Sequence, residues 1–195
     1  AEYEKLYDTF RPERFNAEEL TNLALEAGMS YVTLVSCHHE GFALWNSRIE
    51  PWNSVASCGR DLVRELGEAC DRKGLGFFLY FTHILNWRHP DAWPTEDLPA
   101  GRPAYASPEP RYRLTGPLPP GGNPGYWRWA HACLDELTGF DFPVAGIWLD
   151  IIMAYYQRPD LIPIRETYGR IRSRLPHALI SFKQGATGEE DFASP

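Results

Sequence analysis

The sequence of 195 residues lacks several features that would assign it to a specialised class of protein. No apolar run approaches the roughly 20 residues of a membrane-spanning helix, so we expect no membrane partner. There is no block of like charges, and the formal net charge of -7 argues against a nucleic-acid partner. The four cysteines show no C-x-x-C spacing, so we interpret them as free or structural thiols. The sequence does not assign a cellular compartment. A secreted, periplasmic, lysosome-like or cytoplasmic location is compatible with these features.

Aromatic residues, in contrast, are abundant. The chain contains seven Trp, ten Tyr and ten Phe, a load that suits carbohydrate contacts but also suits a large core. Its length is that of one domain, and we therefore treat residues 1–195 as a single unit. A segment crowded with Pro and Gly, residues 83–125, interrupts it as an insert. A loop this long in a compact domain is usually functional or disordered.

Helical and strand patterns alternate along the chain. We expect helices between Asn16 and Gly28 and at residues 60–73, 126–137 and 161–175, the last interrupted near Pro163. We expect strands at residues 31–37, 75–82, 144–151 and 178–182. Strict alternation of this kind predicts an α/β fold with a parallel sheet, helical cover and right-handed crossovers.

The apolar run at residues 144–151, V-A-G-I-W-L-D-I, contains the first candidate functional residue. It resembles a strand buried on both faces, and it carries Asp150 near its carboxyl end, where α/β proteins place their chemistry. Trp148 lies two residues earlier, on the same side of a strand. A carboxylate beside an aromatic ring indicates a sugar site. The alternative is an aspartate that only caps the following turn.

Polar residues follow the other strands as well, and the ends of parallel strands converge on one face. They are His38, His39 and Glu40 after the first strand, Thr82 and His83 after the second, and Lys183 after the fourth. Neighbouring residues on a strand point in opposite directions, so we do not expect the adjacent histidines to bind one metal ion. Hydrogen bonds from imidazole to a hydroxylated ligand are the interpretation that we favour. We expect neither a metal nor a cofactor.

Several segments resemble the α-L-fucosidases of glycoside hydrolase family 29. Residues 10–17 read F-R-P-E-R-F-N-A, and residues 27–47 contain A-G-M-S-Y, an apolar strand and H-H-E-G-F-A-L-W-N-S. The family pattern there is F-x-P-x-x-F-x-A, A-G-A-K-Y and H-H-D-G-F-x-L-W-x-S. Residues 60–66, 74–80, 147–150 and 190–195 are also similar to family segments. The resemblance covers nearly the whole chain except the insert, and its H-H-x-G-F-x-L-W-x-S string is specific.

This resemblance implies a fold and roles for individual residues. It implies a parallel (β/α) barrel of the TIM type, and it implies that Asp150 is the nucleophile of a retaining α-L-fucosidase. It implies that Trp148 packs against the sugar and that His38 and His39 bond its hydroxyls. It also places further residues at the substrate site: Tyr80, Trp45 and Lys183.

Departures from the family pattern leave alternatives open. The family's first barrel strand, with its histidine, has no counterpart here, and neither does its usual acid/base glutamate. Lys183 stands where the family generally has an arginine, and an ammonium lacks the planar fork of a guanidinium. Glu40, Glu189 and Glu190 are nearby carboxylates, none of which we assign as the acid. A non-catalytic fucose-binding relative is therefore the second hypothesis, and a metal-dependent hydrolase using the histidine pair is the third.

The number of strands raises a structural question. Four βα units cannot close a barrel of eight, so we expect only a partial barrel. The chain is then a segment of a longer protein, a half-barrel completed by a partner such as a second copy, or a fold that stays open. We favour the first of these. The expected partner is a fucosylated glycan or glycoside as substrate.

Overall fold

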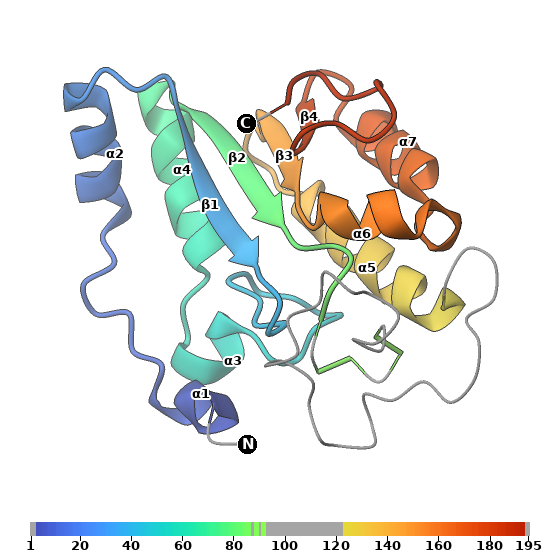
Figure 1. Ribbon diagram of the computed structural model, residues 1–195. Coiled ribbons are helices and arrows are strands. Elements are labelled where there is room, and N and C mark those ends of the chain that lie inside the picture. The colour runs from blue at the N-terminus through green and yellow to red at the C-terminus, as the bar shows by residue number, and fades with distance from the viewer. Residues whose placement is uncertain (1–2, 87, 90, 93–122, 194–195) are drawn as a thin grey trace.

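Four parallel strands run side by side at the centre of the computed structural model, which describes residues 3–86, 88–89, 91–92 and 123–193 (Figure 1). Most of the insert expected at residues 83–125 lies outside these described residues. The strands are β1 (Tyr31–Cys37), β2 (Gly76–Phe81), β3 (Gly146–Leu149) and β4 (Leu179–Phe182). They are ordered β1-β2-β3-β4, and every neighbouring pair is parallel. The predicted α/β fold with a parallel sheet is confirmed.

Helices alternate with the strands along the chain, as the sequence pattern predicted. The principal ones are α2 (Ala17–Glu26), α4 (Leu62–Lys73), α5 (Pro124–Leu137) and α7 (Ile164–Arg174). Asn16 caps α2 by accepting a hydrogen bond from the Glu19 N–H, and Asp61 caps α4 in the same way. A short 3-10 helix (η4, Pro159–Leu161) precedes α7, so the interruption expected near Pro163 is present.

Short helices were not anticipated from the sequence. The structure adds η1 (Tyr3–Lys5), α1 (Leu6–Thr9), α3 (Ser54–Cys58) and α6 (Ile152–Gln157). The strand expected at residues 144–151 ends at Leu149, and the turn expected after it is α6, so this part of the prediction is wrong. Helices of three to six residues are too short to show a periodic pattern and depend on tertiary packing for their stability. Among the described residues, no helix combines the length and the apolar character needed to cross a bilayer.

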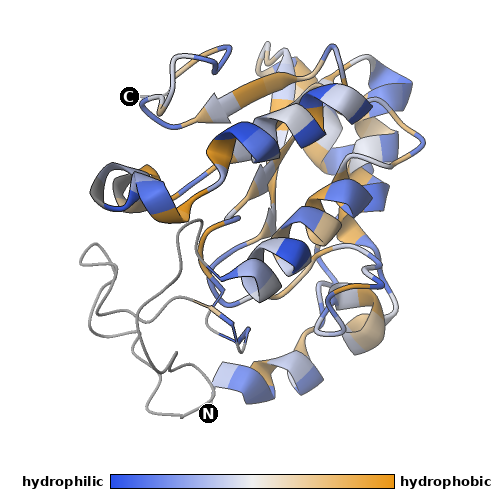
Figure 2. Cartoon of the chain, turned by 90° about the vertical axis from the view of Figure 1, so that its right-hand side faces the viewer, coloured by the Kyte–Doolittle hydropathy of each residue, from blue (hydrophilic) through white to orange (hydrophobic). Residues whose placement is uncertain are grey.

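The hydrophobic core lies between the sheet and the helices. Leu79, Ile147 and Ile180, which occupy matching positions on β2, β3 and β4, are completely buried there. The longer helices are striped in Figure 2, with hydrophilic and hydrophobic residues alternating around them. Burial of these strand residues on the helix side forces their neighbours in sequence to the other face of the sheet.

The second face of the sheet is more open. Tyr31, Val35 and Leu179 lie on it and remain exposed, although they are large apolar residues. Strand register places Tyr80 and Trp148 on the same face, since Val35 pairs with Tyr80 and Tyr80 with Trp148. This is the face that would point to the interior of a barrel. The described sheet is open, as expected for a partial barrel.

The segment after β4 is held by the carboxylate of Glu190. It accepts hydrogen bonds from the backbone N–H groups of Ala186 (2.8 Å), Thr187 (3.1 Å) and Gly188 (2.9 Å), and from the Tyr168 hydroxyl. Burial opposes the charge, but these hydrogen bonds outweigh it and lower the pKa of Glu190 from 4.5 to about 2. Glu190 is therefore a structural anchor for the loop that follows Lys183.

Replacement of this anchor should weaken the fold in a pH-dependent manner. Because its folded pKa is depressed, Glu190 contributes its full stabilisation above pH 4.5 and loses it as the pH falls toward 2. We expect Glu190→Gln to lower the free energy of unfolding at pH 7 by about 1–2 kcal/mol. The difference from the wild type should shrink between pH 4.5 and pH 2. Urea unfolding at several pH values measures it.

Glu189→Gln is the matched control. Glu189 pairs with Arg165 on an exposed surface, and such pairs contribute roughly 0–1 kcal/mol. A Glu190→Gln effect no larger than that of Glu189→Gln at pH 7 would contradict the anchoring role.

Candidate active site

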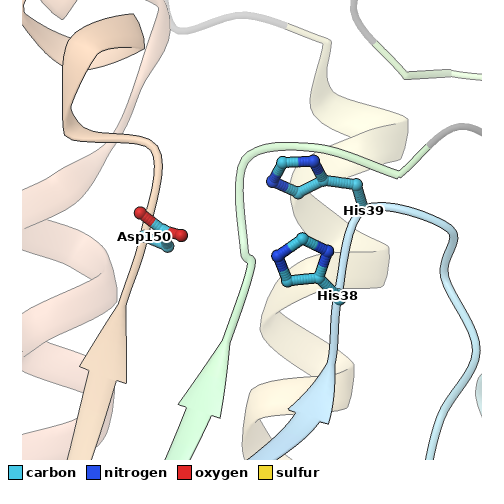
Figure 3. A group of neighbouring side chains, drawn as sticks. All are labelled: His38, His39 and Asp150. Atoms are coloured by element: carbon cyan, nitrogen blue, oxygen red, sulfur yellow. The ribbon is translucent and has the colours of Figure 1, made fainter. Parts of the chain in front are cut away.

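The candidate site lies at the carboxyl edge of the sheet. His38 and His39 come from the loop after β1, and Asp150 directly follows β3, so the imidazoles and the carboxylate face each other across β2 (Figure 3). One ligand atom from each of the three residues lies within 4.8 Å of the others. The sequence placed these groups at one edge, and the structure brings them together.

Both carboxylate oxygens of Asp150 accept hydrogen bonds. Oδ1 accepts from the Lys183 ammonium (2.8 Å) and from the backbone N–H of Ile151 (2.6 Å). Oδ2 accepts from the Tyr80 hydroxyl, which in turn accepts from Thr82 Oγ1 at 3.2 Å. Asp150 thus bonds the next residue, although the helix that follows, α6 (Ile152–Gln157), has no side-chain cap. Its other partners, however, belong to β2 and to the end of β4.

These donors determine the protonation state of Asp150. Burial opposes its charge, but the hydrogen bonds from Lys183, Tyr80 and the Ile151 N–H, together with the charge of Lys183, hold its pKa below the ordinary value. Burial and the bond to Asp150 raise the pKa of Tyr80, so its hydroxyl stays protonated and remains a donor. Asp150 is therefore an ionised carboxylate near neutral pH.

The backbone is unusual at the two strand ends that meet here. Ile151 has a φ of 68° and Lys183 a φ of 42°, and no other described residues except glycines have positive values. A β-branched residue in this region is an outlier that costs roughly 1–3 kcal/mol. The left-handed turn at Ile151 points its N–H at Asp150 and starts α6 immediately afterwards. A turn was expected here from the sequence, but its left-handed backbone at Ile151 was not.

The histidine pair differs from expectation in its orientation. The rings of His38 and His39 stack with their centroids 4.0 Å apart and their planes 19° apart, and His38 also stacks on Tyr80. The expectation that they point in opposite directions is wrong, because β1 ends at Cys37 and strand alternation stops before the pair. With Asp150 they form a possible set of metal ligands. Against a metal ion, the Lys183 ammonium already occupies the space beside Oδ1.

Trp148 lies on the open face of the sheet, next to Tyr80. The two rings meet edge to face, with centroids 5.5 Å apart. The indole N–H of Trp148 has no hydrogen-bond partner among the described residues. Trp148 and Tyr80 therefore form an aromatic wall on the open face of the sheet, beside the strand end that carries Asp150.

Trp45 is not part of this cluster. Its side chain is only 2% exposed, and its indole N–H donates to Glu136 Oε2 of α5 at 2.9 Å. The same carboxylate accepts from Ser47 and from the backbone N–H of Arg48, so it ties the loop after β1 to α5. Because the indole is buried and its N–H is used, we leave Trp45 out of the site, contrary to the sequence-based expectation.

Other polar residues near the strand ends have structural roles. His83 is buried against Phe182 and Trp127, and burial lowers its pKa to about 3, so its ring is neutral. Glu189 pairs with Arg165. Glu40, in contrast, approaches the site, because its carboxylate lies 3.7 Å from Nδ1 of His38.

The turn that carries the histidines is fixed by Gly41 and Asn86. Gly41 has a φ of 78°, and the side chain of Asn86 fills the space where a Cβ would lie, 2.4 Å from that position. Asn86 Oδ1 accepts hydrogen bonds from the N–H groups of Arg88 and His89. The segment after β2 thus buttresses the turn after β1, a contact that the sequence did not reveal.

A parallel sheet that alternates with helices and carries a buried carboxylate at its carboxyl edge is typical of (β/α)-barrel proteins, and we describe the chain as a partial barrel of this class. The family model for α-L-fucosidase matches residues 1–160. The chain therefore belongs to the α-L-fucosidase family, as the sequence resemblance indicated.

Individual relatives agree with this assignment. Rat plasma α-L-fucosidase is 41% identical over 91 residues, which cover 45% of this chain and 20% of that protein. Human tissue α-L-fucosidase is 42% identical over 78 residues, covering 39% and 16%. The chain thus matches about a fifth or less of the length of these curated relatives.

Solved structures show the same fold. α-L-Fucosidase AlfC from Lactobacillus casei superposes with a TM-score of 0.73 at 23% identity, covering 100% of this chain and 58% of that one. Isoenzyme 1 from Paenibacillus thiaminolyticus gives a TM-score of 0.70 at 26% identity, covering 92% and 40%. The described strands and helices therefore correspond to part of a larger fucosidase fold.

The Gly41 buttress can be tested by substitution. Gly41→Ala must accept both a left-handed backbone and a collision with Asn86, and we expect it to lower the free energy of unfolding by about 2–4 kcal/mol. Gly59→Ala is the matched control: its φ is 76°, but nothing lies within 4 Å of the added Cβ, so only the cost of a left-handed backbone, about 1 kcal/mol, applies. Equal losses in the two variants, measured by urea unfolding, would show that Asn86 does not buttress the turn.

Proposed function

We propose that this chain forms part of the catalytic domain of a retaining exo-glycosidase that hydrolyses terminal α-L-fucosides. The observation that carries the proposal is the ionised carboxylate of Asp150, aligned by Lys183 and Tyr80 at the carboxyl edge of the sheet. Membership of the α-L-fucosidase family supports the choice of sugar. We treat residues 1–195 as one partial domain, to which the insert at 83–125 belongs.

In this mechanism, Asp150 is the nucleophile. A carboxylate offers about four lone-pair positions, and the three donors use three of them, so one remains to attack the anomeric carbon. As the new C–O bond forms, the glycosidic C–O bond breaks, and its electron pair leaves on the departing oxygen, which takes up a proton from an acid group. Water then cleaves the glycosyl-aspartate with net retention.

The remaining side chains would hold the sugar. His38 and His39 can bond hydroxyl groups, and the Lys183 ammonium can donate to one while it keeps Asp150 ionised. Fucose carries a C6 methyl group, and the aromatic wall of Trp148 and Tyr80 suits its apolar side. AlfC has been solved with α-L-fucose and with Fucα(1,6)GlcNAc, which supports a fucosylated glycan or glycoside as the substrate here.

A second candidate function, a non-catalytic fucose-binding protein, is favoured by one observation. The Lys183 ammonium contacts Asp150 directly at 2.8 Å, and an ion pair reduces the nucleophilicity of a carboxylate. This function predicts saturable binding of L-fucose without hydrolysis of even an activated aryl fucoside.

The role of Asp150 is tested with 4-nitrophenyl α-L-fucoside. Asp150→Asn keeps the shape of the side chain but removes the nucleophilic charge, and we expect kcat/KM to fall at least about 10³-fold. Asp160→Asn, which alters a surface carboxylate paired with Arg158, is the control and should retain full activity. Undiminished turnover by Asp150→Asn would exclude it as nucleophile. Saturable fucose binding by the wild-type protein, with no turnover of even this activated substrate, would instead favour the second function.

The contribution of Lys183 is tested through the pH profile. Since Lys183 lowers the pKa of Asp150, Lys183→Met should raise that pKa and move the acidic limb of kcat/KM toward higher pH. Tyr80→Phe should shift it in the same direction, because it also removes a donor. An acidic limb that stays in place in both variants would show that Asp150 does not control it.

A further inference from the structure

A cavity of about 300 Å³ lies between the N-terminal helices and the loop after β1. Its walls are mainly aromatic, and they include a single carboxylate. The residues that matter for the argument are Tyr3, Tyr7, Phe10, Phe42, Trp52 and Glu40. The volume is at the lower end of the range of small-ligand sites, about 300–1,000 Å³, which is suitable for one sugar ring.

The aromatic side chains that line this cavity contact one another. Tyr7 stacks on Trp52 with centroids 5.8 Å apart and planes 19° apart. Phe42 meets Phe10, Trp52 and Tyr7 edge to face, at 5.0, 5.1 and 6.0 Å. Four of the aromatic residues that line the cavity therefore support one another's positions.

The polar groups in the walls indicate what kind of ligand fits. Tyr3 and Tyr7 add hydroxyl groups to the Glu40 carboxylate, so the lining is amphipathic. An entirely apolar ligand would desolvate the carboxylate without compensation. The ligand need not be a cation that stacks on the Trp52 ring, because the Arg88 guanidinium already lies 3.9 Å from the centroid of that ring. A pyranose is a neutral ligand with apolar C–H faces and a rim of hydroxyls. It can therefore pack against the aromatic rings and form hydrogen bonds with the polar groups of the lining.

Glu40 joins this cavity to the active site. Its carboxylate lines the cavity and also lies 3.7 Å from Nδ1 of His38, whose ring stacks on His39 and Tyr80. A glycoside whose fucose lies at Asp150 and which extends past His38 would therefore place its second sugar against the aromatic residues of this cavity. We propose that this cavity binds a neutral pyranose, the sugar to which the terminal fucose is attached. Its assignment to that sugar depends on the proposed function of the neighbouring site.

Binding measurements on intact disaccharides test the proposal. In an Asp150→Asn background, which preserves the linkage, calorimetry compares methyl α-L-fucopyranoside with α-L-fucosyl-N-acetylglucosamine disaccharides of several linkages. We expect at least one disaccharide to bind about tenfold more tightly than the methyl fucoside. Tyr7→Ala should remove most of that advantage while leaving the affinity for methyl fucoside unchanged, which also shows that the variant is folded.

A leucine pair provides a matched control. Leu6 lines the cavity and is 57% exposed, whereas Leu23 lies on α2, outside the cavity, and is 62% exposed. Leu6→Ala should reduce the disaccharide advantage about two- to threefold, and Leu23→Ala should leave it unchanged.

Several results would overturn the proposal. They are equal affinity for methyl fucoside and every disaccharide, a disaccharide advantage that survives Tyr7→Ala, and tighter binding of octyl α-L-fucoside or of tetramethylammonium than of any disaccharide. If no fucoside binds at all, the proposed function fails. Binding of methyl β-D-glucopyranoside, a pyranose without fucose, then tests separately whether the cavity is a pyranose site. If this glucoside quenches the tryptophan fluorescence of the wild type but not of Tyr7→Ala, the cavity is supported as a pyranose site. If the wild type shows no quenching, the pyranose site is overturned.

Discussion

The carboxylate of Asp150 links three of the four strands at one edge of the sheet. It follows β3, and it accepts hydrogen bonds from Tyr80 on β2 and from Lys183 at the end of β4. Burial alone would favour its neutral form, so these donors are what keep the group charged. The stacked histidines and the aromatic wall then surround a fixed negative charge, which gives the edge of the sheet its chemical character.

Three carboxylates in this chain show how environment assigns a role to one functional group. Glu136 accepts hydrogen bonds from three groups of the loop after β1, and Glu190 from three backbone amides and a tyrosine. Both hold loops in place. Asp150 has a comparable number of donors, but it stands at a strand end beside two imidazoles and an indole. Position on the sheet, and not the number of hydrogen bonds, distinguishes the candidate catalytic group from the two anchors.

Much of the architecture was predictable because it depends on local patterns. The strand Tyr31–Cys37 and the cap at Asn16 follow from β-branched residues and from a short polar side chain before a helical pattern. The orientation of His38 and His39 was predicted wrongly, because the alternation rule was extended beyond the end of β1. Trp45 was assigned to the sugar site from a motif, but only tertiary packing shows that Glu136 binds its indole.

The sequence by itself determined the parallel α/β order and the placing of Asp150, the histidines and Lys183 at strand ends, because hydrophobic runs and their polar boundaries are local properties of the chain. Only the tertiary structure decided that Lys183 pairs with Asp150 and that Glu40 both lines the aromatic cavity and approaches His38. These contacts join residues distant in sequence, and their geometry depends on strand register and on left-handed turns that an isoleucine or a lysine rarely adopts.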